Sequence, residues 1–166
     1  MSEKAGKVLV TGASGYIASH VIKVLLERGY EVVGTVRSLA NKDKYAFLYG
    51  FPQAKEHLEL REANLLDPNS WDSALNGVTN VFHVASPIPP SIPQHEDELI
   101  KPAVEGTRSV IEASLRNKVK RLIFTSSCLT VMVRTDGKVA TEDDWSQENL
   151  LHHYPKSKYL AEKLFW

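Results

Sequence analysis

The sequence predicts an α/β fold, a doubly wound parallel sheet with helices on both faces. Short apolar runs alternate along the chain with longer amphipathic segments, which is the pattern of successive βαβ units. The first apolar run leads into a glycine-rich turn that opens a helical pattern. A length of 166 residues, 43% of them hydrophobic, suits one domain of ordinary globular composition. We therefore expect residues 1–166 to form a single domain.

The first strand and the first helix lie near the N-terminus. Residues 7–11 form a short apolar run typical of a buried strand. Residues 16–28 follow with apolar side chains at helical spacing, and Gly29 indicates the end of that helix. The face that we expect to be buried carries Ile17, Val21, Val24 and Leu25.

The remaining elements continue this alternation. Apolar and β-branched runs predict strands at residues 31–36, 57–61, 78–84 and 121–125. Helical spacing and terminal glycine, proline or polar residues predict helices at residues 41–49, 68–75, 97–117 and 154–166. Asp67 and Pro68 suit the cap and the first position of the helix at 68–75. Residues 131–151 are polar and lack periodicity, so we expect irregular structure there.

Composition excludes several classes of protein. Lys plus Arg and Asp plus Glu both total 20, so the chain lacks the basic excess of a nucleic-acid binder. Cys128 is the only cysteine, which excludes an internal disulfide and a cysteine-based zinc site; we expect it to be a small buried residue. The apolar runs are shorter than the ~18 residues of a membrane span, and the N-terminal residues lack a signal-peptide core. We therefore expect a cytoplasmic protein that binds no nucleic acid, membrane or metal.

The turn after the first strand has the spacing of a phosphate-binding loop. Small residues stand at Gly12, Gly15 and Ala18. They let the backbone turn tightly and approach a diphosphate, which the free N–H groups of the following helix can bind. The pattern indicates a dinucleotide site, and a tight turn without a ligand is the alternative.

The end of the second strand is where dinucleotide sites distinguish NAD from NADP. Arg37 follows this strand, and no carboxylate occurs before Asp43. A guanidinium can hold a phosphate with two parallel hydrogen bonds, and Lys42 and Lys44 add positive charge. The segment predicts NADP(H) rather than NAD(H), and an arginine that is merely solvated is the alternative.

Two further segments each admit two interpretations. Asp67 can accept a hydrogen bond from an adenine amino group, or it can simply cap the helix that follows. The small residues at 83–87 can let a cofactor ribose pass, or they can serve packing alone. We expect His83 to be a core or supporting residue rather than a catalyst.

The last motif combines serine, tyrosine and lysine. The fifth strand ends at Thr125, Ser126 and Ser127, and Tyr154 and Lys158 lie one helical turn apart further along. An ammonium group lowers the pKa of a neighbouring tyrosine from about 10. The tyrosine can then protonate a substrate oxygen that a serine orients, while a cofactor delivers hydride. A Tyr-x-x-x-Lys pair alone is more often just an exposed helix start, but its order after the glycine turn and the serines indicates a reductase.

Taken together along the whole chain, these motifs resemble those of the extended short-chain dehydrogenase/reductases, in the dihydroflavonol reductase-like branch of the NAD-dependent epimerase/dehydratase superfamily. The segments that carry the resemblance are residues 10–18, 35–38, 64–67, 81–87, 124–127 and 154–163. The resemblance implies a Rossmann-type fold, NADP(H) as cofactor, and reduction of a small-molecule aldehyde or ketone to an alcohol. It also implies a possible homodimer through the helix at 97–117.

Residue roles carry over from the resemblance by position. Next to the cofactor it places Gly12, Gly15, Tyr16, Ile17, Arg37, Lys44, Leu66, Asp67, Val84, Ala85, Ser86, Thr125, Tyr154 and Lys158. Of these, Arg37 and Lys44 would hold the 2′-phosphate. Ser127, Tyr154 and Lys158 would form the catalytic triad, with Lys158 also holding the nicotinamide ribose.

The sequence departs from the family pattern in two respects. Met132 stands where plant flavonoid reductases carry Asn or Asp, which argues against a flavonoid substrate. The chain ends at Trp166, so we expect the C-terminal substrate region to be missing. Two alternatives to the reductase therefore stay open: a truncated module that binds NADP(H) without turnover, and an enzyme of the sugar-nucleotide epimerase or dehydratase type.

Overall fold

A five-stranded parallel sheet forms the centre of the molecule. The computed structural model describes residues 6–40, 42–88, 91 and 93–166. The strands are β1 (Lys7–Val10), β2 (Val32–Val36), β3 (Leu58–Glu62), β4 (Val78–His83) and β5 (Arg121–Phe124), and their order is β3-β2-β1-β4-β5. The four strand pairings are parallel. The order reverses between β1 and β4, which is where such sheets bind ligands.

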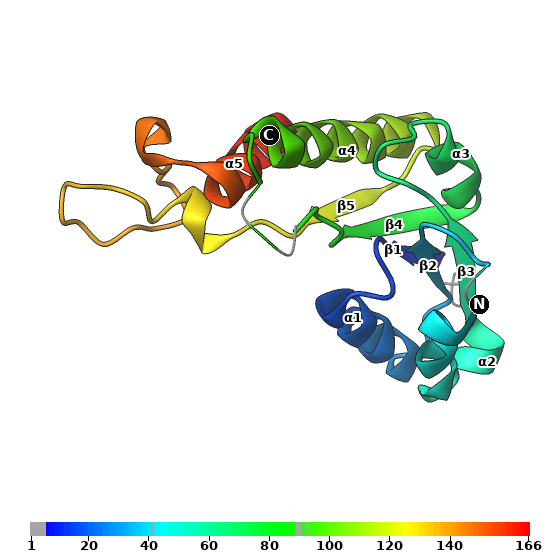
Figure 1. Cartoon of the computed structure of the whole chain (residues 1–166). Helices are drawn as coiled ribbons and strands as arrows, with labels where there is room; N and C mark the ends of the chain where they lie inside the picture. Colours follow the sequence, from blue (N-terminus) through cyan, green and yellow to red (C-terminus); the bar gives the residue numbers. More distant parts are fainter. Residues whose placement is uncertain (1–5, 41, 89–90, 92) are drawn as a thin grey trace.

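Helices cover both faces of the sheet, as predicted (Figure 1). The elements on one side are α1 (Tyr16–Glu27), η1 (Lys42–Gly50) and α2 (Ala54–His57), and those on the other are α3 (Ser70–Ala74), α4 (Asp97–Arg116) and α5 (His153–Phe165). The 131–151 segment is irregular apart from η3 (Glu148–Leu150). Within the described residues, no helix combines the length and the apolar character needed to cross a membrane.

The two cores follow from the alternation of side chains along the strands. Val8 and Val10 of β1 pack in a cluster with Ile22 of α1. Leu9, between them, packs in the opposite cluster with Trp71 of α3. The central strands β1 and β2 are therefore buried on both faces, which explains their near-continuous apolar runs.

The buried face of α1 differs from the predicted one. Ile17 and Val24 are 57% and 44% exposed, and the residues that face the sheet include Ala18, Ile22 and Leu26. The small side chain of Ala18 lets the first turn approach the sheet closely, and this rotation leaves Ile17 at the rim of the site described below. The prediction was wrong for Ile17 and Val24 because it weighed apolar size and not the closeness of approach, whereas Leu25 is buried and Val21 packs against the core as predicted.

The predicted cap at Asp67 was also wrong. The helix begins at Ser70, and its N-cap residue, Asn69, makes no side-chain cap bond. The Asp67 carboxylate instead accepts the Asn69 backbone N–H at 3.1 Å, which is a local turn that competes with helix capping. Pro68 therefore precedes the helix and does not lie within it.

Smaller differences concern the edges of other elements. The third strand starts one residue later than predicted because the short helix α2 precedes it. The helix predicted at 41–49 is the 3₁₀ helix η1, and Asn41 lies outside the described residues. Cys128 is exposed and not buried, because it begins the short 3₁₀ turn η2 (Cys128–Thr130) at the surface.

Candidate active site

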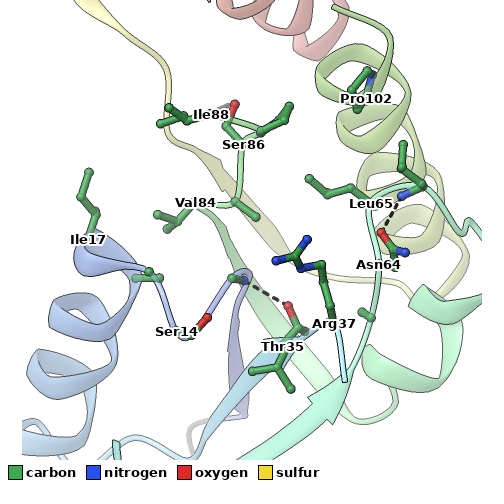
Figure 2. A pocket seen from close by; sticks show the side chains of 18 of the residues that line it. Ser14, Ile17, Thr35, Arg37, Asn64, Leu65, Val84, Ser86, Ile88 and Pro102 are labelled. Atoms are coloured by element: carbon green, nitrogen blue, oxygen red, sulfur yellow. Dashed lines mark hydrogen bonds between the residues drawn. The ribbon is translucent and has the colours of Figure 1, made fainter. Parts of the chain in front are cut away.

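A cavity of about 680 Å³ opens at the carboxyl ends of the central strands (Figure 2). Its walls come from the glycine turn, the ends of β2 and β4, the β3–α3 loop and the start of α4. The predicted cofactor residues that line it are Gly12, Gly15, Tyr16, Ile17, Arg37, Lys44, Leu66, Val84, Ala85 and Ser86. The fold thus brings together residues that are far apart in the sequence.

The glycine turn forms the floor of this cavity. Gly12 has a φ of 72°, and a Cβ there would lie 3.1 Å from the Ala85 Cβ, so a side chain would be both strained and crowded. The Gly12 N–H donates to the Thr35 hydroxyl at 3.2 Å. Helix α1 starts just after Gly15, with no side-chain cap and no acidic residue in its first turn. Its N-terminal N–H groups and positive dipole suit a diphosphate.

The corner at the end of β2 is cationic. Arg37 points into the cavity (Figure 2), and Lys44 of η1 lines the same cavity. Of the lining residues that the structure describes, only Glu98 is acidic, and it belongs to α4. The donor set at this corner therefore suits a phosphate monoester.

A buried hydrogen-bond chain holds the end of β4 against the glycine turn. The Thr11 hydroxyl oxygen accepts the Val84 and Ala85 backbone N–H groups at 2.9 and 2.8 Å. Its lone pairs are then used, so its own hydrogen goes to His83 Nδ1, 3.0 Å away. His83 must therefore carry its proton on Nε2 and donate it to Thr107. Its 1% exposure confirms the predicted supporting role.

We expect His83 to stay neutral down to low pH. Burial, reinforced by the charge of Lys158, lowers the pKa of His83 to about 3. Because the unfolded chain takes up this proton near pH 6.5, the His83 contribution to stability is complete above pH 6.5. It is lost as the pH falls toward 3, at about 1.4 kcal/mol per pH unit. ¹⁵N NMR of the imidazole between pH 4 and 8 measures this, and a titration near pH 6.5 in the folded protein would contradict it.

The three predicted catalytic residues lie around the end of β5 and the start of α5, outside the lining of the large cavity. Lys158 is 3% exposed, and its ammonium donates to the Thr125 carbonyl at 2.6 Å. Burial lowers the pKa of Lys158, and the charge of Glu162 opposes this shift. The Ser127 hydroxyl oxygen accepts the Leu129 N–H at 3.2 Å.

Tyr154 is the second residue of α5 and is half-buried. Glu96, at the start of α4, holds this helix end: its carboxylate accepts the His153 backbone N–H at 3.1 Å and the Lys156 ammonium at 3.0 Å. His153 has a φ of 49°, so the residue before Tyr154 is held in a left-handed conformation that side chains disfavour. The interaction with Lys156, above all, lowers the pKa of Glu96 to about 2. These two interactions of Glu96, together the Glu96 clamp, are therefore formed throughout the neutral pH range.

Asp67 and Thr125 are the two further cofactor candidates that do not line the large cavity. The Asp67 carboxylate is used by the turn described above. Thr125 offers its carbonyl to Lys158. Ser127 lines a second, more open hollow of about 510 Å³, together with Ser126 and Glu162. The Ser126 hydroxyl donates a hydrogen bond to Glu162.

Sequence reasoning missed the wall that α4 contributes. Glu98, Leu99 and Pro102 line the large cavity opposite the glycine turn, and Figure 2 shows Pro102 above Leu65. The only signal in the sequence is that this helix follows the end of β4, which is itself at the site. Spacing alone does not say how a helix crosses back over a sheet.

A family model and curated plant reductases match nearly the whole chain. The model of the 3-beta hydroxysteroid dehydrogenase/isomerase family matches residues 9–166. The chain is 41% identical over 174 residues to tetraketide alpha-pyrone reductase 1 of Arabidopsis thaliana, with 100% of this chain and 53% of that protein covered. It is 43% identical over 168 residues to dihydroflavonol 4-reductase of the same plant, with 96% and 44% covered.

Solved structures also superpose on nearly the whole chain. Vestitone reductase from alfalfa superposes with a TM-score of 0.81 at 38% identity, over 96% of this chain and 51% of that one. Gre2 from Candida albicans in complex with NADPH has a TM-score of 0.81 at 30% identity, over 96% and 52%. The chain therefore spans about half the length of the relatives that it matches.

Proposed function

Since the chain belongs to the 3-beta hydroxysteroid dehydrogenase/isomerase family, we propose that residues 1–166 form its NADP(H)-binding domain and serve the reduction of a small-molecule carbonyl to an alcohol. The family and the relatives confirm the resemblance drawn from the motifs. The observation that carries the choice of cofactor is the corner at the end of β2, where Arg37 and Lys44 line the cavity, while the acidic residue of the described lining, Glu98, belongs to α4.

The proposed cofactor lies across the carboxyl ends of the strands. Its diphosphate binds at Gly12, Gly15 and the first turn of α1, beside Tyr16 and Ile17. Its 2′-phosphate binds Arg37 and Lys44, and its adenine packs near Leu66, which is 67% exposed. Asp67, just outside the lining, stays the candidate for the adenine amino group. Val84, Ala85, Ser86 and Thr125 border the path toward the nicotinamide.

The proposed chemistry uses the groups at β5 and α5. The bound reduced nicotinamide supplies the hydride. The Ser127 hydroxyl orients the substrate oxygen, and the Tyr154 hydroxyl donates the proton that completes the alcohol. Lys158, whose ammonium donates to the Thr125 carbonyl, favours the phenolate that Tyr154 then carries, because the two residues lie one helical turn apart on α5. The phenolate recovers its proton from water.

Titration of the chain with NADPH and NADH in parallel tests this proposal. We expect tighter binding of NADPH, and Arg37→Ala should weaken it by roughly 10- to 100-fold, the size of a charge-assisted hydrogen bond. Binding of NADH should change little, because it has no 2′-phosphate. Equal affinity of the unaltered chain for both nucleotides, or binding of neither, would overturn the proposal.

A further inference from the structure

The backbone that follows β2 is held by side chains at three consecutive residues. The Ser38 carbonyl accepts a hydrogen bond from the Tyr45 hydroxyl at 2.5 Å. The Leu39 N–H donates to the Glu62 carboxylate at 2.5 Å. The Ala40 N–H donates to the Ser38 hydroxyl at 3.2 Å. The loop that carries Arg37 is therefore tied to two separate elements, η1 and β3.

Both anchors are themselves fixed by the fold. Tyr45 is 6% exposed and belongs to the core cluster under α1 and η1. Glu62 is the last residue of β3 and stands opposite Val36 in the sheet register. The Ala63 N–H continues this pairing by donating to the Val36 carbonyl at 2.9 Å. The two anchors thus transmit the position of the sheet and of the core to the loop.

The two anchoring groups are poorly suited to bind a phosphate directly. Glu62 does not line the cavity, and its carboxylate would repel a phosphate. Tyr45 lines the cavity, but its hydroxyl hydrogen is donated to the Ser38 carbonyl. Their contribution is therefore to the loop. Ordering the long arginine side chain on binding costs conformational entropy. Fixing the Arg37 backbone beforehand reduces the conformational entropy that is lost when the ligand binds.

We propose that Tyr45 and Glu62 are positioning residues that preorganise Arg37 and thereby set the preference for NADP(H) over NAD(H). This inference rests on the proposed function, because it assumes that Arg37 binds the 2′-phosphate. It predicts a specific signature: loss of either anchor lowers the affinity for the nucleotide that has the 2′-phosphate and spares the other.

The test measures the affinities for NADPH and NADH in four variants by calorimetry. Tyr45→Phe and Glu62→Ala should weaken NADPH binding about three- to tenfold, the worth of one hydrogen bond, and change NADH binding less than twofold. Glu62→Gln keeps an oxygen that accepts the Leu39 N–H, so it should retain the NADPH affinity. Tyr49→Phe is the matched control, because Tyr49 lies on the same 3₁₀ helix with 41% of its surface exposed; both affinities should stay unchanged.

A double-mutant cycle with Arg37→Ala separates positioning from general stability. If the anchors act through Arg37, Tyr45→Phe should cause no further loss in the Arg37→Ala background. An equal loss of NADPH and NADH affinity, or a loss that persists without Arg37, would overturn the inference. Failure of the proposed function looks different, because the unaltered chain would then bind neither nucleotide or show no preference.

Discussion

Replacing Tyr154 with phenylalanine is expected to lower kcat for NADPH-dependent aldehyde reduction by about 10²- to 10⁴-fold, the usual worth of a positioned general acid. The hydroxyl is the proposed proton donor, and water is a poor substitute for a donor fixed beside the substrate. The ring stays, and the Glu96 clamp on the preceding backbone is untouched. The affinity for NADPH should therefore stay within about twofold, which calorimetry and steady-state kinetics together can measure.

Tyr159→Phe is the matched control for this experiment. Tyr159 lies on the same helix, is 7% exposed, and packs edge-on against Trp145. Tyr159→Phe removes a tyrosine hydroxyl from the same helix, as Tyr154→Phe does, but leaves the proposed proton donor in place. The value of kcat should therefore stay within about threefold. If Tyr154→Phe were as active as the unaltered chain, Tyr154 would not be the acid.

The same assay separates the alternative functions. A module that only holds NADP(H) would bind the nucleotide and consume none with a panel of aldehydes and ketones. An epimerase or dehydratase returns its hydride to the product, so it changes a sugar nucleotide without net oxidation of NADPH. Net oxidation that depends on the carbonyl and on Tyr154 would support the reductase.

That residues of the proposed nucleotide site would line one cavity could be predicted from the sequence because of a property of parallel sheets. All the strands end at one edge, so residues that follow different strands converge there. Gly12, Arg37 and Val84 each follow a strand end, and all three line the cavity. The burial of His83 could also be predicted, because His83 is the last residue of a strand and is followed by small residues.

The rest of the site depends on tertiary contacts that leave no periodic signal. The start of α5 is set by Glu96, which lies on another helix. Lys158 is directed by a carbonyl at the end of β5. Asp67 failed as a cap because a competing turn two residues away uses the same carboxylate. Such choices between nearby partners are decided by packing, so residue type and spacing alone do not settle them.

The largest expected loss of stability is at Trp71, where replacement by alanine should lower the free energy of unfolding by about 3–5 kcal/mol. Trp71 is 1% exposed and packs between α3 and the sheet with Leu9 and Val110. Its indole N–H also donates to the Asn64 carbonyl at 3.1 Å. The replacement would leave a large cavity, and the Asn64 carbonyl, which also accepts the Asp67 backbone N–H at 3.0 Å, would lose one of its hydrogen bonds. This is a large share of the roughly 5–15 kcal/mol that hold a domain folded.

Urea unfolding of Trp71→Ala and Trp166→Ala compares a buried with an exposed tryptophan. Trp166 is 85% exposed, so its replacement should change stability by less than about 0.5 kcal/mol. The Asn64 loop also lines the large cavity proposed to bind the nucleotide. Trp71→Ala should therefore weaken NADPH binding even at temperatures where it is still folded. Equal stability losses at both tryptophans would show that Trp71 does not anchor the core, and unchanged NADPH affinity in the folded variant would show that its bond to Asn64 does not shape the site.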